Sequence, residues 1–512
     1  MVSKTKTSLL QRFLNLIERG GNALPHPATL FALLAGLTLL VSLIGHLLGW
    51  EIVHPATGEI IKTKNLVSGE GLHFILEMTV KNFTDFAPLG IVLVAMLGIG
   101  IAESSGLIAV AIRLLVLKAP RKMLTFVLVF AGILSNMASD IGYVLLIPMA
   151  GVIFMAVGRH PIVGMAAAFA GVSGGFSANL FLGTIDPLLA GLSQEAAQII
   201  DPAYTVNPTA NYYFMIVSTF MISIVGTWVT EKIIAPRFGS YTLAGTEDDT
   251  KLQGLTSAER KGLRNATITF VIFMILILAG SIPENGILRE VDGSLLHSPL
   301  LKGVVTLLFV IAGTMGVVYG LSVGTFKNDA DIMEGMADSM KMLATYLVLV
   351  FFAAQFVAYF KVSNLGIVLA VNGAETLKAA NLNIYVLMIL FILFAASVNM
   401  LMGSASAKWA ILAPVFIPIF MLMGYSPELS QAVFRIGDSV TNIISPMMSF
   451  FALIIAFFQK YDKNSGIGTI ISTMIPYSII FFIAWTILLI AWIYFKIPLG
   501  PDSPLFYEGA HL

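Results

Sequence analysis

Long apolar runs separated by short polar links are the dominant pattern along this chain. Pro27 to Trp50 and Met342 to Phe360 contain no Asp, Glu, Lys or Arg, and each is long enough to cross a bilayer as a helix of about twenty residues. Further apolar runs lie at 87–112, 266–282, 303–323 and 468–496. Because 123–230 adds an even number of crossings and 384–458 an odd number, the pattern predicts an all-α polytopic membrane protein with about nine transmembrane helices.

The composition is also that of a membrane protein. Hydrophobic residues make up 57% of the 512 residues and charged residues only 11%, so the lipid bilayer is the first expected partner. With 29 basic and 29 acidic residues the formal net charge is zero, and no nucleic-acid partner is expected. The sequence has no cysteine, which excludes disulfides, thiolate metal sites and thiol catalysis.

The basic residues of the polar links predict the orientation in the membrane. The link 113–122 has four basic residues and no acid, and the link 231–264 has six basic residues, so both belong in the cytoplasm. By contrast, 283–300 and the tail after Lys496 are mainly acidic. We therefore expect a multi-pass protein of the bacterial inner membrane with a cytoplasmic N-terminus and a periplasmic C-terminus.

These assignments divide the chain into two halves. Residues 51–86 are interpreted as a polar external connection within the first half. The predicted segments are a cytoplasmic amphipathic segment at 1–24, a first transmembrane half at 25–237, a cytoplasmic linker at 238–265, a second transmembrane half at 266–497 and a periplasmic tail at 498–512.

Both halves contain apolar regions broken by Gly, Pro, Asn and Ser. The first half is predicted to hold a re-entrant hairpin near 124–160 and a broken helix at 171–187, and the second a hairpin near 390–425 and a broken helix at 429–458. The Asn136–Asn179 and Asn399–Asn442 spacings are both 43 residues, and the Pro148–Pro161 and Pro414–Pro427 spacings are both 13. Since the two regions start from opposite sides of the membrane, they predict an inverted repeat, as in many secondary transporters.

Broken helices at membrane depth predict a cavity, because unpaired backbone groups survive there only inside protein or beside water. Helix N-termini can receive an anion, and amide, hydroxyl and carbonyl oxygens can hold Na⁺. The candidates for such a Na⁺ site are Asn136, Asn179, Asn399 and Asn442, and Ser139 joins Asn136, Asn179 and Asn442 as a candidate ion-coupling residue. The alternative is that these amides only hold helices together.

Ionisable residues at the breaks are stronger candidates, because a charge at membrane depth costs at least about 2.5–3.5 kcal/mol. Asp186, Arg435 and Asp438 all lie at broken segments. Arg435 and Asp438 are three residues apart and can instead form an internal ion pair. Glu103, Asp140 and Lys408 are open to a second reading, in which each lies near an interface. Trp409 is either a stacking platform for an aromatic substrate or an interface anchor.

Several of these segments resemble the p-aminobenzoyl-glutamate transporter (AbgT) family, in particular its MtrF-like branch, which is associated with antimetabolite efflux. The likeness covers nearly the whole chain. The most specific motifs are Gly183-Thr184-Ile185-Asp186-Pro187, Gly403-Ser404-Ala405-Ser406-Ala407-Lys408-Trp409 and Arg435-Ile436-Gly437-Asp438-Ser439.

The resemblance implies a homodimer without a cofactor, whose subunits each have nine spans and two re-entrant hairpins. The substrate-binding residues that it implies are Asp186, Asn399, Ser406, Trp409, Pro427, Arg435, Asp438 and Pro446. Lys408 stands where a neutral polar residue is expected. The implied substrates are p-aminobenzoate, its glutamate conjugate and sulfonamide antimetabolites, moved by alternating access.

Such an aromatic acid suits the local chemistry, with Trp409 for its ring and Arg435 for its carboxylate. Asp186 and Asp438 would couple transport to H⁺, whereas the Asn and Ser oxygens would suit Na⁺, and the sequence leaves both ions and both directions open. One alternative is a Na⁺-coupled dicarboxylate importer of the same architecture. Another is an intramembrane aspartyl enzyme using Asp186 and Asp438, although Arg435 would keep a carboxylate ionised.

Overall fold

A computed structural model describes residues 25–53, 58–137, 141–239, 254–295 and 298–509. The amphipathic segment predicted at 1–24 lies outside the described residues, as do Ser139 and Asp140.

Among the described residues, nine helical stretches are long and apolar enough to cross a membrane, which is the total that the sequence predicts. Their distribution differs, because one such stretch begins within 123–230 and two lie within 384–458. They are α2 (Pro27–Leu47), α3 with α4 (Gly69–Thr84 and Ala87–Ser104), α10 to α11 (Tyr212–Phe238), α12 (Ser257–Ser281), α14 (Val304–Val323), α16 (Ala344–Val362), α18 (Ile384–Leu401), α19 (Ala405–Leu422) and α22 (Ile467–Tyr494). Shorter elements are α5 (Leu107–Leu117), η1 (Arg121–Met123), η5 (Thr230–Ile234), α11 (Ala235–Phe238), α13 (Pro299–Lys302), α15 (Asp329–Met342) and α17 (Leu365–Ala379).

Two polar links are more ordered than the sequence predicts. Within 51–86, strands β1 (Glu51–Val53) and β2 (Ile60–Lys62) pair antiparallel, and α3 follows. Helix α3 begins where the Ser68 hydroxyl accepts a hydrogen bond from Gly71 N, as an N-cap does. Within the predicted linker 238–265, a capping box of Thr256 and Glu259 starts α12 at Ser257.

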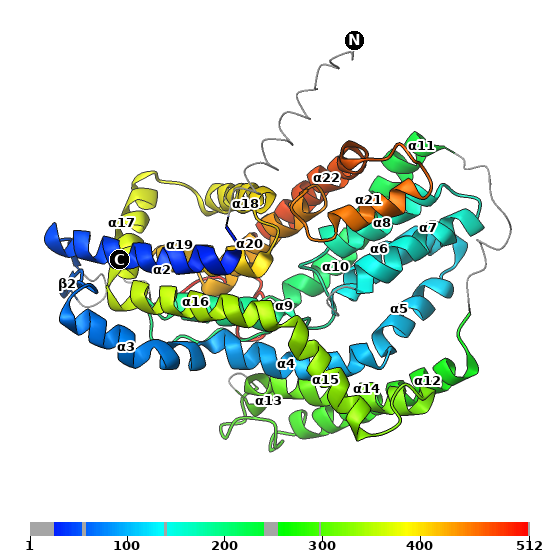
Figure 1. Ribbon diagram of the computed structural model, residues 1–512, viewed down its shortest axis with the longest axis horizontal. Helices are drawn as coiled ribbons and strands as arrows, with labels where there is room; N and C mark the ends of the chain where they lie inside the picture. The colour runs from blue at the N-terminus through cyan, green and yellow to red at the C-terminus, as the bar shows by residue number, and fades with distance from the viewer. Residues whose placement is uncertain (1–24, 54–57, 138–140, 240–253, 296–297, 510–512) are drawn as a thin grey trace, which may run out of the picture.

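Helices α4, α12, α14 and α15 pack together on one side of the molecule, while α2, α3 and α16 run side by side on another (Figure 1). Small residues allow the closest of these approaches. A Cβ at Gly98 of α4 would lie 2.5 Å from Phe309 Cα of α14, and a Cβ at Gly316 would lie 2.7 Å from Ala102 N. The α4–α14 contact therefore depends on glycine on both helices.

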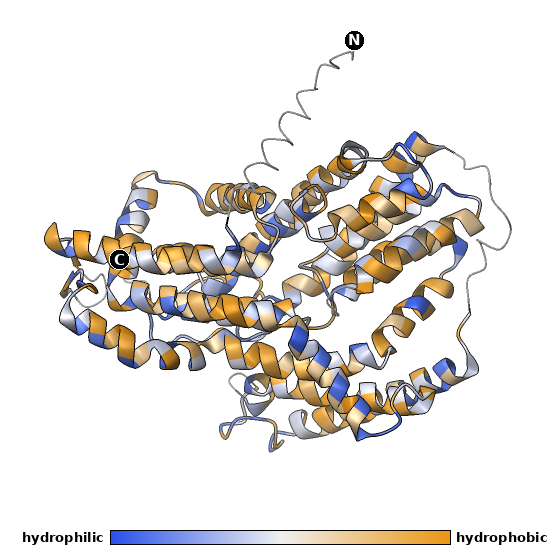
Figure 2. Cartoon of the chain, viewed as in Figure 1, coloured by the Kyte–Doolittle hydropathy of each residue, from blue (hydrophilic) through white to orange (hydrophobic). Residues whose placement is uncertain are grey.

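Most residues of the long helices are apolar (Figure 2). Some of them lie on the surface, and in helix α12 Ile272 and Leu276 are 51% and 59% exposed. A helix that is apolar on its outer side suits contact with lipid rather than water.

The same order of elements occurs in the two predicted repeats. In the first, α6 (Leu124–Leu134), η2 (Ser135–Met137), η3 (Gly142–Leu146) and α7 (Ile147–Ala156) form a helix pair, followed by α8 (Pro161–Phe169), η4 (Ala170–Gly174), a non-helical break at 175–184 and α9 (Ile185–Ala197). In the second, α18 and α19 form the pair, followed by α20 (Pro427–Asn442), a break at 443–450 and α21 (Phe451–Gln459). Whether the pairs are re-entrant stays a prediction.

Candidate functional site

Helix α20 carries most of the polar side chains of the candidate site. Pro427 is its first residue, and the Ser426 hydroxyl caps it by accepting a hydrogen bond from Leu429 N at 3.1 Å. Every residue from Pro427 to Val440 is buried, including Gln431, Arg435 and Asp438. Polar groups in such a place must find partners inside the protein, and those partners define the site.

One pair joins the two repeats directly. Arg435 Nη2 lies 2.6 Å from Asp186 Oδ1, and the two side chains are 5% and 1% exposed. Asp186 lies in the first turn of α9, where the helix dipole favours a negative charge. Its second oxygen accepts a hydrogen bond from Gly183 N at 2.7 Å. The break at 175–184 therefore positions Asp186 against α20.

The internal pair between Arg435 and Asp438 is not formed. Asp438 Oδ1 instead lies 2.5 Å from Lys408 Nζ of α19, and these side chains are 1% and 0% exposed. The interpretation of Lys408 as an interfacial side chain is therefore also wrong. Asp186 and Asp438 thus each pair with a cation from another helix. The pairing also supplies the buried Arg435 and Lys408 with the counter-charges that they need.

Asn399 of α18 completes the cluster around Asp438. Its Nδ2 lies 2.7 Å from Asp438 O, 2.9 Å from Thr441 Oγ1 and 2.8 Å from Asn442 Oδ1. Its Oδ1 accepts a hydrogen bond from Lys408 Nζ, and Asn442 Nδ2 donates to Asp438 Oδ2 at 3.3 Å. The structure thus brings Asn399 and Asn442 together with Asp438, Lys408 and Thr441, and leaves Asn136 and Asn179 outside this cluster.

The two amides of the first repeat bind mainly backbone. Asn136 Nδ2 donates to Val172 O at 3.0 Å, and Asn179 Oδ1 accepts from Leu180 N at 2.8 Å. A Cβ at Gly183 would lie 2.8 Å from Asn136 O, so the hairpin turn touches the backbone of the break. These contacts favour a bracing role for Asn136 and Asn179.

Trp409 lies inside the protein and not at an interface, since it is 0% exposed. Its ring stacks on Phe434 with centroids 4.5 Å apart, and its Nε1 donates to Ser193 Oγ at 2.9 Å. Ser193 then donates to Gln431, which donates to Asn211. This chain ties α19 to α9 and α20.

A small cavity lies beside Arg435. It has a volume of about 10 Å³ and is lined by Ser177, Asn211, Phe214, Met215, Ala432, Arg435, Ile436 and Trp485, which leaves room for about one water molecule. Within the described part of the chain, Arg435 Nε and Ser177 Oγ have no hydrogen-bond partner. Ser177 N donates to Ser439 Oγ at 3.1 Å, so this cavity also lies between the repeats.

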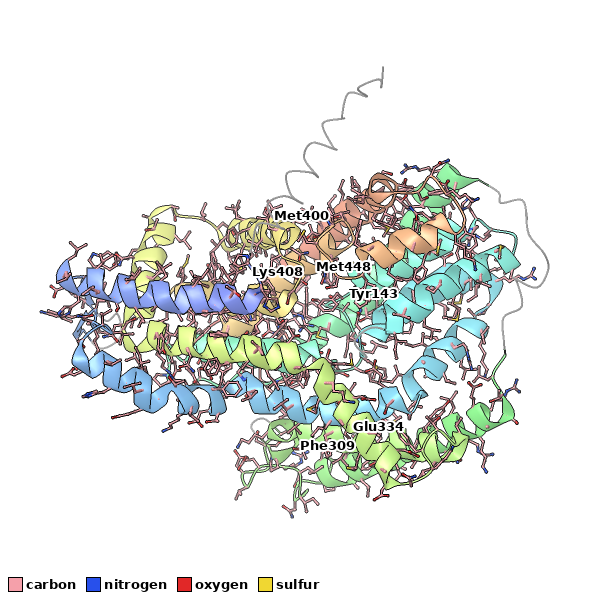
Figure 3. The ribbon with its side chains drawn as sticks, viewed as in Figure 1. Tyr143, Phe309, Glu334, Met400, Lys408 and Met448 are labelled. Atoms are coloured by element: carbon pink, nitrogen blue, oxygen red, sulfur yellow. The ribbon has the colours of Figure 1, made fainter. Side chains whose placement is uncertain are left out.

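Two predicted residues lie apart from these pairs. Ser406 is partly exposed at the α18–α19 turn, with Oγ 3.1 Å from Ser404 Oγ. Pro446 lines a separate open cavity of about 260 Å³ with Met447, Met448, Ser449, Phe451, Ala452, Ile455 and Ile467. Figure 3 shows Lys408, Met448 and Tyr143 in the central region where the repeats meet.

Comparison with known proteins shows which class of protein this fold represents. The sequence profile of the AbgT transporter family matches residues 12–507. The chain belongs to the AbgT family of transporters. The p-aminobenzoyl-glutamate transport protein of Escherichia coli (strain K12) is 38% identical over 486 residues, which is 95% of each chain. This AbgT protein is therefore a multi-pass membrane transporter and not an enzyme.

Solved structures of two AbgT relatives agree with this fold. The Neisseria gonorrhoeae MtrF structure, from a class of antimetabolite efflux pumps, matches with a TM-score of 0.92 and 50% identity, covering 96% of this chain and all of MtrF. The Alcanivorax borkumensis YdaH transporter matches with a TM-score of 0.89 and 45% identity, covering 93% of this chain and all of YdaH. The intramembrane enzyme hypothesis is set aside, and the paired state of Asp186 and Asp438 agrees with that.

Some of the site was visible in the sequence and some was not. Lys408 is the only Asp, Glu, Lys or Arg residue between Lys378 and Glu428. A single charged residue in so long an apolar stretch is a signal from which its place at the site could have been predicted. Ser193 and Gln431 gave no comparable signal, because a polar residue in a half-polar helix is ordinarily a surface residue.

Proposed function

We propose that this AbgT protein transports aromatic acids of the p-aminobenzoate type, including p-aminobenzoyl-glutamate and sulfonamide antimetabolites, by ion-driven alternating access. The observation that carries the proposal is the buried Arg435–Asp186 pair between the repeats, beside a small cavity that Arg435 lines. An arginine so placed can exchange one carboxylate partner for another. The relatives named above supply the substrate class.

Substrate binding and ion binding are linked in this geometry. A substrate carboxylate that binds Arg435 competes with Asp186 for the same guanidinium. Once displaced, the Asp186 carboxylate is buried without a counter-charge, so it must bind a proton or another cation. In this way the Arg435–Asp186 pair can connect the movement of cargo to an ion gradient.

The aromatic part of the substrate requires a rearrangement around Trp409. One face of its ring is covered by Phe434 in the described conformation. We propose that opening of the α19–α20 contact frees this face for the substrate ring, since stacked aromatic pairs are worth about 0.5–1.5 kcal/mol and can be exchanged.

Flux in liposomes tests the proposed function. The purified protein should move labelled p-aminobenzoyl-glutamate or a labelled sulfonamide when a pH gradient or a Na⁺ gradient is imposed separately, and the sign of the flux gives the direction. Competition by citrate or succinate, with none by p-aminobenzoate, would instead favour the dicarboxylate importer.

The proposal also includes the oligomeric state of the protein and its orientation in the membrane. We place the protein in the bacterial inner membrane as a homodimer, with residues 1–24 in the cytoplasm and 498–512 in the periplasm. Membrane-impermeant labelling of single cysteines at Ser8 and at the exposed Glu508 in whole cells should modify only the second, because the natural sequence has no cysteine to react. Labelling of the first site alone would reverse the orientation.

A further inference from the structure

Lys408 lies in a cluster of oxygen ligands of the kind that binds a monovalent cation. Its Nζ contacts Asp438 Oδ1 and Asn399 Oδ1. Asn442 Oδ1, Thr441 Oγ1 and Asp438 O lie within 2.9 Å of Nδ2, the other polar atom of the Asn399 amide. Carboxylate, amide, hydroxyl and carbonyl oxygens at a helix break are the ligands that hold Na⁺ in many transporters.

Lys408 lies at a position that is unfavourable for a positive charge. It is the fourth residue of α19, at the end of the first helical turn, where the dipole disfavours a positive charge. It is also 0% exposed, and burial of an ammonium group is costly unless a counter-charge compensates it. Asp438 is the one acid that forms an ion pair with it among the described residues.

Charge balance decides what else this cluster can hold. The Lys408 ammonium and the Asp438 carboxylate sum to zero, and both are buried. Addition of Na⁺ would leave a net positive charge away from water, which is strongly unfavourable. The ammonium also occupies the space on Asp438 Oδ1 and Asn399 Oδ1 that an ion would need.

We propose that the Lys408 ammonium is a tethered cation that fills the cation position of the second hairpin, so that Na⁺ does not bind between Asn399 and Asp438. This assigns Lys408 a specificity-determining role. The proposal rests on the ion-driven step of the proposed function. It specifies that step further, because it excludes Na⁺ as the coupling ion in this repeat and leaves the proton.

Hydrogen exchange of the wild-type protein tests the proposal without any substrate, so failure of the proposed transport function would not affect the result. The full chain in detergent is compared in NaCl and in KCl at equal ionic strength. Exchange in peptides that cover 399–408 and 438–445 should be the same in both salts. Slower exchange of these peptides in NaCl would show that Na⁺ binds there and would overturn the proposal.

Removal of the tethered cation should create a Na⁺ site. In Lys408→Gln, raising NaCl from 1 to 100 mM at constant ionic strength should raise the Tm by roughly 5 °C more than in wild type. The matched control Lys378→Gln removes an exposed lysine of α17 and should respond like wild type, and Lys408→Gln/Asp438→Asn should lose the gain. A folded Lys408→Gln protein with the wild-type response would contradict the proposal, and if this variant does not fold, the exchange measurement decides.

Discussion

Asp186 and Asp438 are each buried beside a cation from a different element. At the residue scale this makes each side chain depend on its partner, because a buried charge that loses its counter-charge costs about 3–5 kcal/mol. The hydrogen bonds from Gly183 N to Asp186 and from Asn442 to Asp438 add to this dependence. The proposed transport role of each acid and its contribution to stability therefore depend on the same atoms, and variants are needed that change one without the other.

Asp186→Ala should abolish flux in liposomes and lower the free energy of unfolding by about 3–5 kcal/mol, because Arg435 is left buried and unpaired. Asp186→Ala/Arg435→Ala should recover much of the stability and none of the flux. Thermal unfolding with the flux assay distinguishes the two effects. A single variant as stable as wild type would show that Arg435 has another counter-charge.

Glu428 should make stability depend on pH. It is buried beneath the C-terminal tail, outside the nine candidate spans, and its Oε2 accepts a hydrogen bond from Tyr204 at 2.9 Å. Burial raises the pKa of Glu428 from 4.5 to about 7. Because the folded state holds this proton more tightly than the unfolded chain, stability is highest at low pH and falls as the pH rises to about 7.

The measurement for Glu428 is the Tm between pH 5 and pH 8. Glu428→Gln should lose part of the decline that wild type shows, since the amide is neutral throughout. Glu375→Gln, at an exposed position on α17, should keep the wild-type profile. Identical profiles for wild type and Glu428→Gln would mean that this carboxyl group does not titrate in the folded protein.

At the element scale, each hairpin turn rests on the backbone of a break. In the first repeat the close approach needs Gly183 beside Asn136, and in the second it needs Gly403 beside Met447. The glycine is on the break in one case and on the turn in the other. A close contact between the turn and the break therefore occurs in both repeats, although the glycine that permits it lies on a different partner in each.

Gly403→Ala should therefore separate the turn from the break. The new Cβ would overlap the Met447 carbonyl group, and overpacking of this kind costs about 1–3 kcal/mol. We expect flux to fall at least roughly tenfold while the circular dichroism spectrum stays helical. Gly36→Ala, where a Cβ has open space, is the matched control and should keep full flux.

The sequence was informative where membrane physics restricts the possibilities. Apolar length predicted the spans, and the paired breaks with their ionisable residues predicted the region of the site. Partners were not predictable, because Arg435 and Asp438 are neighbours in sequence yet bind Asp186 and Lys408 from other elements. Helix α3 was missed because its apolar and polar residues are mixed, and only the Ser68 cap marked its start.

At the scale of the whole molecule, the two repeats meet through α9, α19 and α20. Transport by alternating access requires some of these contacts to break and re-form. The Ser177–Ser439 hydrogen bond crosses this boundary, and it is a suitable place to test whether the repeats move relative to each other.

A disulfide between Ser177→Cys and Ser439→Cys should stop flux, because it would fix the two repeats in one arrangement. The natural chain has no cysteine, so oxidation can act only at the introduced pair. Reductant should restore flux, and each single cysteine variant should be insensitive to oxidant. Full flux in the oxidised double variant would show that the repeats move together as one body.

The neutral Lys408–Asp438 pair has a consequence for the electrical behaviour of the transporter. A free charge that crosses the membrane field gains or loses about 2.3 kcal/mol per 100 mV. As long as Lys408 of α19 and Asp438 of α20 stay paired, a movement of these two side chains together would carry no net charge across the field. The transmembrane voltage would then act on the cargo and on any coupling ion, and not on the Lys408–Asp438 pair itself.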